Sequence, residues 1–270
     1  MQTSENIFVR KRLLRHFTPR NDDFIIFTFM NILIITGGSS GIGKAIAQKY
    51  FEENFAVFSI SRSKAVGVSY QQIEADLSKT LETVSSLQSI LSQLEINKVS
   101  SITLINNAGS LGKINTLGNL TPENISKTIQ LNTTTPLILS NEFIRSTNEL
   151  NCKKQIINIS SGAALNPYPG WSVYCSSKAA IDMTTKTTAA EQEEISNGVK
   201  CVAIYPGVVD TNMQTDIRKT SESEFKNVQR FKELKKNNEL YSPEFVAKRI
   251  FEIDMKNQLY NGDIIDIRKF

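Results

Sequence analysis

An apolar run that leads directly into a glycine-rich loop constrains the fold of this chain more than any other feature. Residues 32–43 read Ile-Leu-Ile-Ile-Thr-Gly-Gly-Ser-Ser-Gly-Ile-Gly, and the helix-like residues 44–53 follow. This order predicts a buried strand, a tight loop and a helix. Gly37, Gly41 and Gly43 allow a sharp turn, close approach of the backbone to a phosphate, and close packing of helix on strand. The spacing G-x-x-x-G-x-G therefore indicates a dinucleotide site, with an ordinary strand-to-helix turn as the alternative.

The next predicted strand, residues 55–60, is followed by Ser61, Arg62 and Ser63. Folds that select NAD usually place Asp or Glu at this position, where the carboxylate binds a ribose hydroxyl. This chain has no acid there, and an arginine can instead pair with the 2′-phosphate of NADP. Arg62 therefore predicts NADPH as the cofactor, unless it is only a solvated charge at the end of a strand.

A tyrosine and a lysine four residues apart, Tyr174 and Lys178, are candidates for proton transfer. If residues 172–190 are helical, this spacing places both side chains on one helix face. The cation would favour phenolate and lower the pKa of the tyrosine from its ordinary value of about 10. Ser161 closes an Asn-Ile-Ser-Ser run that reads as the end of a buried strand, so three suitable groups can converge. The alternative is a surface Tyr and Lys on an amphipathic helix.

Length and composition favour one α/β domain. The chain has 270 residues, of which 40% are hydrophobic, and its strand-like and helix-like segments alternate. One sizeable core is therefore expected, in a doubly wound arrangement. Between residues 78 and 101, a helical period predicts a helix with its apolar positions at Leu81, Val84, Leu87, Leu91 and Leu94.

Charge and residue usage exclude several classes of function. The formal net charge is +4, and part of the excess lies in the first 20 residues. The other basic cluster, Lys232, Lys235 and Lys236, is mixed with acids in a predicted solvated helix, which disfavours nucleic-acid binding. The single histidine, His16, lies in the N-terminal tail. Its position argues against a Ser-His-Asp hydrolase and against a histidine metal site, so no metal is expected.

The three cysteines, Cys152, Cys175 and Cys201, show no C-x-x-C spacing. This pattern predicts neither a zinc site nor a disulfide framework, and it fits a reducing cytoplasm.

Residues 1–29 precede the first predicted strand, and Met30 stands where such a domain often begins. The apolar stretch 24–35 is too short to span a bilayer, which takes about 20 residues. Removing it as a signal peptide would destroy the first strand and the glycine loop. We expect residues 1–29 to be a disordered or loosely packed extension, or the result of a misassigned start. Residues 30–270 alone should then keep full activity and melting temperature.

Taken together, residues 31–270 resemble the short-chain dehydrogenase/reductase family. The resemblance implies a single Rossmann domain with a parallel seven-stranded sheet and helices on both faces. It also implies a homodimer or homotetramer formed through the helices around residues 124–148 and 172–196. The matching motifs, in family order, are Thr36-Gly-Gly-Ser-Ser-Gly-Ile-Gly43, Asp76-Leu77, Asn106-Asn107-Ala108-Gly109, Asn132, Ser161, Tyr174 with Lys178, and Pro206-Gly207 with Thr211.

The resemblance also implies roles in catalysis. Tyr174 would be the general acid in carbonyl reduction, and Ser161 would hydrogen-bond the substrate carbonyl. Lys178 would lower the pKa of the tyrosine and hold the nicotinamide ribose. Asn132 would belong to a water-linked proton relay, although the residue type alone equally suits satisfaction of buried backbone groups.

Other matching positions would bind the dinucleotide. Asp76 would contact the adenine amino group, although it could instead cap the following helix, and Asn107 would stabilise the central sheet. The expected cofactor-binding residues are Gly37, Ser39, Ser40, Gly41, Ile42, Gly43, Arg62, Asp76, Leu77, Asn107, Ala108, Gly109, Tyr174, Lys178, Pro206, Gly207, Val209 and Thr211.

A closer resemblance concerns the last 110 or so residues. Residues 205–214, 231–235 and 240–247 look like sepiapterin reductases and their bacterial relatives, which include benzil reductases. Residues 160–171 and 262–268 look nearer to the bacterial benzil reductases. Both groups reduce a carbonyl within a vicinal dicarbonyl system. We therefore expect hydride transfer from NADPH to one ketone of a benzil-like diketone, or alternatively to the side chain of a pterin.

The same resemblance points to substrate residues. In the pterin enzymes an aspartate near the C-terminus anchors the pterin ring, and the matching position is Asp266, although Arg268 beside it could neutralise the charge. Trp171, with Tyr168, Phe225 and Phe231, could form an aromatic pocket, or simply pack. A different class of function is a dinucleotide-binding redox sensor without turnover. The full set of Asn, Ser, Tyr and Lys favours the enzyme.

Overall fold

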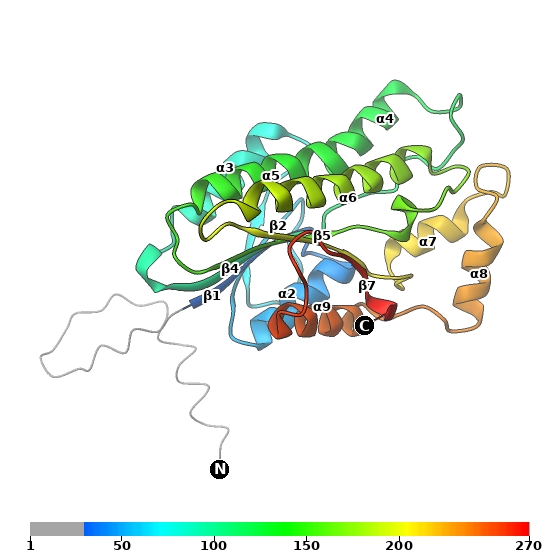
Figure 1. The fold of residues 1–270 in the computed structure, drawn as a ribbon. Coiled ribbons are helices and arrows are strands. Elements are labelled where there is room, and N and C mark those ends of the chain that lie inside the picture. Colours follow the sequence, from blue (N-terminus) through cyan, green and yellow to red (C-terminus); the bar gives the residue numbers. More distant parts are fainter. Residues whose placement is uncertain (1–29, 270) are drawn as a thin grey trace, which may run out of the picture.

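The computed structural model describes residues 30–269 (Figure 1). Their centre is a seven-stranded sheet, and all six strand pairings are parallel. The predicted extension 1–29, which includes His16, lies outside the described residues. The strands are β1 (Met30–Thr36), β2 (Ala56–Ser61), β3 (Gln71–Glu74), β4 (Val99–Asn106), β5 (Lys153–Ile159), β6 (Lys200–Tyr205) and β7 (Ile264–Asp266).

The strand order in the sheet is β3-β2-β1-β4-β5-β6-β7. The chain therefore winds outward from β1 in one direction, returns to the middle, and winds outward from β4 in the other. The loops that follow β1 and β4 diverge at this point, and they leave a crevice at the carboxyl ends of the strands, where ligands bind in open α/β sheets. This arrangement confirms the predicted doubly wound Rossmann fold.

Helices cover both faces of the sheet (Figure 1). Helices α3, α5 and α6 lie on one face, and α2 and α9 lie on the other, while α7 and α8 extend beyond the end of the sheet. The helices are α2 (Gly41–Glu52), α3 (Thr80–Leu91), α4 (Pro122–Ile129), α5 (Thr135–Ser146), α6 (Ser172–Glu193), α7 (Asn212–Lys219), α8 (Val228–Lys236) and α9 (Pro243–Lys256), with 3₁₀ turns at Ile96–Lys98, Gly162–Ala164 and Ile267–Lys269 and a π turn at Gln130–Thr134.

The apolar run in β1 supplies both layers of the core. Residues 32–35 are completely buried, and successive side chains of a strand point to opposite faces. Ile32 and Ile34 join the cluster that includes Leu87 and Phe143, beneath α3 and α5. Leu33 and Ile35 join the cluster beneath α2 and α9. Each such side chain stabilises the fold by about 1.5–3 kcal/mol, so the run fixes β1 at the centre.

The helix predicted within residues 78–101 is shorter than expected. Helix α3 ends at Leu91, and β4 begins at Val99. Leu81 is 85% exposed, whereas Thr83 and Ser86 are buried together with Leu87. The two hydroxyls donate hydrogen bonds to the carbonyl oxygens of Lys79 (3.0 Å) and Thr83 (2.9 Å), respectively, and so satisfy their polar groups inside the core. The apolar period therefore identified Leu87, Leu91 and Leu94, which lie in or against the core, but it wrongly included Leu81.

No helix in the described part of the chain combines the length and the apolar character that crossing a membrane requires.

Candidate active site

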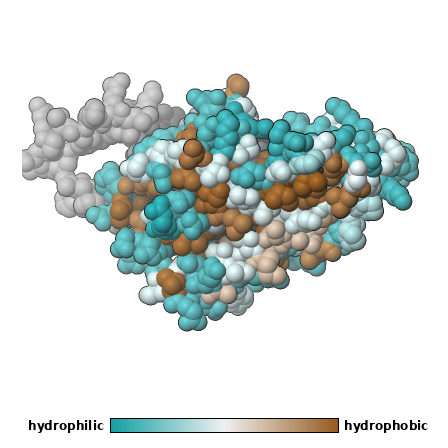
Figure 2. Space-filling model, turned by 90° about the horizontal axis from the view of Figure 1, so that it is seen from above, coloured by the Kyte–Doolittle hydropathy of each residue, from teal (hydrophilic) through white to brown (hydrophobic). Residues whose placement is uncertain are grey.

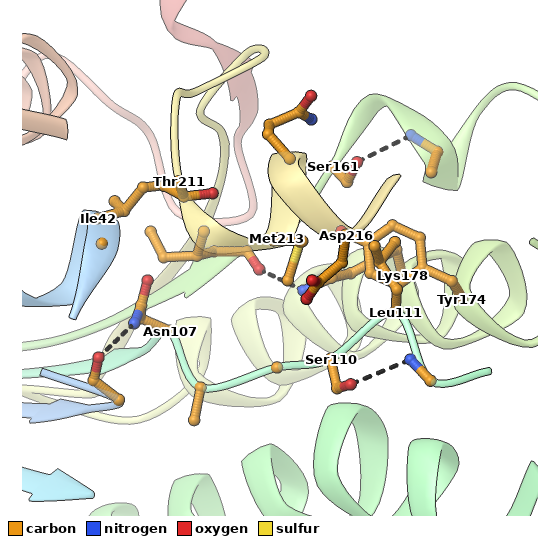
Figure 3. Close-up of a pocket in the computed structure, with 18 of the residues that line it drawn as sticks. Ile42, Asn107, Ser110, Leu111, Ser161, Tyr174, Lys178, Thr211, Met213 and Asp216 are labelled. Carbon is orange, nitrogen blue, oxygen red and sulfur yellow. Dashed lines mark hydrogen bonds between the residues drawn. The ribbon is translucent and has the colours of Figure 1, made fainter. Parts of the chain in front are cut away.

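A cleft of about 1240 Å³ lies where the strands end. Its walls come from the glycine loop, the segments that follow β2, β4, β5 and β6, and helices α6 and α7. Figure 3 shows residues from these separate segments around one space. Except for Asn132, Phe225 and Asp266, every residue that the sequence predicted for catalysis, cofactor or substrate lines this cleft.

The glycine loop forms one end of the cleft. Gly37 and Gly41 have φ values of 71° and 53°, which side chains rarely tolerate. A Cβ atom on Gly43 would lie 2.3 Å from the carbonyl oxygen of Gly37, so only glycine allows α2 to pack this closely on the loop. Helix α2 begins here without a side-chain cap at Ser40 and without an acid in its first turn. Its free amides therefore fit the pyrophosphate of a dinucleotide.

A set of hydrogen bonds joins the ends of β1 and β4. The side-chain amide of Asn107 donates to the carbonyl oxygen of Thr36 at 2.9 Å. The hydroxyl oxygen of Thr36 accepts from the backbone N–H groups of Asn107 and Ala108, both at 3.0 Å. These bonds hold the two strands together at the switch point, in line with the expectation for Asn107. Thr36 was not predicted as a site residue, although a hydroxyl between an apolar strand and a glycine could have indicated it.

Asp76 and Arg62, the two residues expected to bind the adenosine half of the dinucleotide, both line the cleft. The carboxylate of Asp76 accepts hydrogen bonds from the N–H (3.0 Å) and hydroxyl (2.8 Å) of Ser78, which lower its pKa. Because the N-cap of α3 is Lys79, Asp76 closes the turn before the helix and does not cap it. Arg62 is exposed and faces the cleft. An exposed guanidinium at the end of β2 is available to a phosphate.

Tyr174 and Lys178 lie on α6, as the spacing predicted, and both are buried. The Lys178 Nζ atom is 5.7 Å from the centroid of the Tyr174 ring. It donates a hydrogen bond of 2.8 Å to the carbonyl oxygen of Ile159, the last residue of β5 (Figure 3). Ser161 begins a 3₁₀ turn, and its Oγ accepts from the N–H of Ala163 at 3.1 Å. The structure thus brings the three predicted proton-transfer groups to one end of the cleft.

The pKa values of this pair differ from the sequence expectation. Burial raises the pKa of Tyr174 to about 12, against a lowering effect of a hydrogen bond with Ser161. Burial also lowers the pKa of Lys178 to about 8. The sequence predicted a lowered tyrosine pKa, whereas in this arrangement the pKa is raised, because burial disfavours the phenolate. A protonated phenol at neutral pH is nevertheless the state that a general acid requires.

Asn132 lies in the π turn between α4 and α5, behind the cleft wall. Its Oδ1 accepts from the N–H of Ser110 at 2.9 Å, and its Nδ2 donates to the carbonyl oxygen of Ser110 at 2.8 Å and to Ser177 at 3.1 Å. The side chain therefore satisfies buried backbone, which was the alternative considered for it. These bonds also fix the loop after β4 against α6.

The segment after β6 forms the wall opposite the glycine loop. Gly207 has a φ of 74°, and Pro206, Val209 and Thr211 line the cleft around it. A Cβ atom on Gly41 would be 3.3 Å from the Thr211 methyl group, so the two walls nearly touch here (Figure 3).

The substrate end of the cleft has an aromatic wall. The Trp171 ring stacks on Phe225, with ring centroids 4.6 Å apart and planes 7° apart. Its centroid is 5.6 Å from that of Tyr174 and 5.4 Å from that of Phe231. The centroid of the Tyr168 ring lies 5.0 Å from that of Trp171. The predicted aromatic pocket is therefore next to the proton donor.

Asp266 is not brought to this pocket. Arg268 Nε bonds both of its carboxylate oxygens, at 2.8 and 2.9 Å, and this pairing lowers the pKa of Asp266. Arg268 lines the cleft, whereas Asp266 does not. Sequence reasoning also missed Asp216 and Arg230, which line the cleft from α7 and α8. Charged residues on amphipathic helices gave no signal that distinguished them from solvated ones.

A doubly wound sheet, an uncapped glycine-loop helix and a Tyr-Lys pair define a dinucleotide-dependent oxidoreductase. The family model described as "short chain dehydrogenase" matches residues 31–222. The chain belongs to this family, which confirms the resemblance seen in its motifs. Its fold binds a nicotinamide dinucleotide, and the residues of the cleft fit one.

Relatives and solved structures agree with this assignment. The benzil reductase ((S)-benzoin forming) of Bacillus subtilis is 39% identical over 244 residues, which cover 89% of this chain and all of the relative. A sepiapterin reductase of Meriones unguiculatus is 28% identical, over 87% of this chain and 95% of the relative. A short-chain dehydrogenase/reductase structure from Saccharomyces cerevisiae has a TM-score of 0.76 at 24% identity, and it covers 88% of this chain and 96% of that one.

Proposed function

We propose that this chain is an NADPH-dependent carbonyl reductase that acts on one ketone of a vicinal dicarbonyl compound such as benzil. The observation that carries the proposal is the aromatic wall of Tyr168, Trp171 and Phe231, which lines the cleft beside the Tyr174 proton donor. A flat aromatic substrate can stack there while its carbonyl oxygen approaches the phenol. The benzil reductase relative, similar over its whole length, supports this substrate class.

The residues of the site have distinct tasks in the proposed reaction. A bound reduced nicotinamide would supply the hydride that reaches the carbonyl carbon. Tyr174 donates its phenolic proton to the carbonyl oxygen, and Ser161 donates a hydrogen bond to the same oxygen. The positive charge of Lys178 stabilises the phenolate that remains. One N–H of its three is engaged by Ile159, so the others are available to the ribose hydroxyls. Asn132, which orders the neighbouring loop, is proposed to support return of the proton through water.

The cofactor preference is proposed from Arg62, which is exposed at the end of β2 and lines the cleft. The substitution Arg62→Asp would place a carboxylate against the 2′-phosphate. We expect it to raise the KM for NADPH by about tenfold or more and to change that for NADH far less. Steady-state kinetics with both cofactors measure this. Equal effects on the two would remove the argument for NADPH.

The substrate is tested by following NADPH oxidation with benzil and with sepiapterin side by side, with NADH as a control. The proposal predicts turnover of benzil and little turnover of sepiapterin. A preference for sepiapterin would favour the pterin alternative. The structure supports benzil over a pterin, because Arg268 occupies both oxygens of Asp266, the expected pterin anchor.

A redox sensor without turnover is the alternative from another class. Binding of NADPH without oxidation of either substrate would favour it. The buried Tyr174 and Lys178 beside Ser161 support an enzyme, because a sensor has no need of a proton donor.

We also propose a cytoplasmic location, because the described cysteines, Cys152, Cys175 and Cys201, are free thiols.

A further inference from the structure

A buried carboxylate lies one helical turn beyond Lys178. Asp182 is only 8% exposed, and both of its oxygens accept hydrogen bonds. The hydroxyl of Ser160 donates to Oδ1 at 2.6 Å, and the phenol of Tyr205 donates to Oδ2. Neither the motifs nor the proposed reaction gives this aspartate a task. A buried carboxylate is costly unless it is paired, so its position needs an explanation.

The two donors of Asp182 belong to the ends of two strands that line the cleft. Ser160 stands between Ile159, whose carbonyl oxygen accepts from Lys178 Nζ, and the catalytic Ser161. Tyr205 ends β6, immediately before Pro206 and Gly207. Asp182 therefore ties the carboxyl ends of β5 and β6 to helix α6. The segments that present Ser161 and Lys178 share this anchor.

The same carboxylate acts on Lys178 through its charge. Burial lowers the pKa of Lys178, and the negative charge of Asp182 opposes this lowering. Tyr174 on the same helix, Tyr205 of β6 and Asp216 of α7 also line the cleft with Lys178, and burial raises the pKa of both phenols. Both phenols are neutral near pH 7, and Ser161 and Asn132 carry no charge. Asp182 is thus the acid whose charge opposes the lowering of the Lys178 pKa by burial.

We infer that Asp182 is a positioning residue that keeps Lys178 protonated and fixes it against the end of β5. This inference deepens the proposed reductase function and rests on it. A neutral Lys178 would leave the Tyr174 phenolate without a counter-charge after proton transfer. In a variant whose residue 182 has no charge, the loss of activity on raising the pH should therefore begin at a lower pH than in the unsubstituted chain.

The first test is the pH profile of kcat/KM for benzil reduction in Asp182→Asn. This substitution keeps the shape of the side chain and removes the charge. We expect the descending alkaline limb to shift to lower pH by about half a unit or more. Asp182→Glu, which restores a carboxylate, should return the limb toward its original position. If Asp182→Asn does not fold, Asp182→Ser removes the charge with a smaller side chain and should give the same shift.

Asp254→Asn is the matched control. Asp254 is also a buried carboxylate, which accepts from Tyr50 at 2.8 Å and from Lys153 at 2.6 Å, but it lies on α9 outside the cleft. Asp254→Asn should lower the melting temperature without moving the alkaline limb of the pH profile. A limb that stays in place in the folded Asp182 variants, or that moves equally in Asp254→Asn, would overturn the inference.

A second measurement does not depend on turnover. Competitive labelling of lysine amines across a pH series, with mass spectrometry of the Lys178 peptide, reports the pKa of this amine directly. We expect a lower pKa in Asp182→Asn than in the unsubstituted chain and no change in Asp254→Asn. If benzil is not reduced but this shift is found, the proposed substrate fails and the role of Asp182 stands. An unchanged pKa overturns the role of Asp182, whichever substrate is used.

Discussion

Tyr174 and Lys178 share one buried end of the cleft, and burial shifts their pKa values in opposite directions. The pKa of the phenol rises to about 12 and that of the ammonium falls to about 8. At neutral pH the tyrosine therefore carries its proton, and the lysine is still mostly charged. This is the combination that reduction of a carbonyl requires, because the acid gives its proton beside a cation.

Replacement of Tyr174 by Phe tests the proton donor. The change removes only the hydroxyl, so the ring should keep its contacts with Trp171. We expect kcat for carbonyl reduction to fall by about 10²–10⁴-fold, because no other described group at this position can donate the proton. The Kd for NADPH, measured by fluorescence titration, should change little. Full activity in Tyr174→Phe would exclude the proposed role.

The raised pKa of Tyr174 also predicts an alkaline loss of stability. The folded chain holds this proton up to about pH 12, whereas the unfolded chain releases it near pH 10. Its contribution is therefore complete below pH 10 and is lost as the pH rises to about 12, by at most about 3 kcal/mol. Urea unfolding at several pH values should show a steeper decline for the unsubstituted chain than for Tyr174→Phe. Parallel declines would contradict the buried phenol.

At the scale of elements, the start of α2 combines two requirements. Its first turn offers uncapped amides to an anion, and Gly43 lets the helix approach the glycine loop closely. The glycine spacing in the sequence was enough to predict both the loop and the helix. The buried face of α3 was less predictable, because it includes the polar residues Thr83 and Ser86, whose hydroxyls are satisfied by the helix backbone.

Gly43→Ala tests the close approach of α2 to the loop. The new methyl group would meet the Gly37 carbonyl oxygen at 2.3 Å, and backbone must move to relieve this contact. We expect the free energy of unfolding to fall by about 1–3 kcal/mol. The Kd for NADPH should rise by about tenfold or more, because the amides that face the pyrophosphate are displaced.

Gly67→Ala is the control for that substitution. Gly67 also has a positive φ, of 73°, but an added Cβ would meet nothing within 4 Å, and the residue does not line the cleft. It should cost about 1 kcal/mol of stability through backbone strain and leave the Kd for NADPH unchanged. A similar loss of NADPH affinity in both variants would mean that general destabilisation, and not helix displacement, explains the Gly43 result.

On the scale of the whole molecule, one face carries a band of apolar side chains. Figure 2 shows hydrophobic residues gathered in a band across the face covered by α3, α5 and α6. Exposed members of these helices include Leu81, Leu137 and Met183. Such patches commonly mark protein interfaces. The family resemblance implies an oligomer formed through the helices around residues 124–148 and 172–196, and these ranges include α5 and α6. We therefore propose that this face joins two copies of the chain.

The variant Leu137→Glu with Met183→Glu tests this interface. Charges placed on both helices would oppose burial of the face, so we expect the molar mass in solution, measured by light scattering, to fall to that of a smaller assembly. Val66→Glu, at a residue that is 90% exposed outside these helices, is the control and should leave the mass unchanged. A monomeric unsubstituted chain would contradict the proposal at once.

The sequence by itself determined the central strand, the glycine loop with its helix, and the shared face of Tyr174 and Lys178. These features follow from local stereochemistry, because the period of a strand or helix and the conformational freedom of glycine act over a few residues. Only the tertiary structure decided how deeply the pair is buried, that Arg268 lines the cleft whereas Asp266 does not, and that Asp182 binds Ser160 and Tyr205. Each of these depends on desolvation or on partners from distant parts of the chain, and no local pattern in the sequence records such contacts.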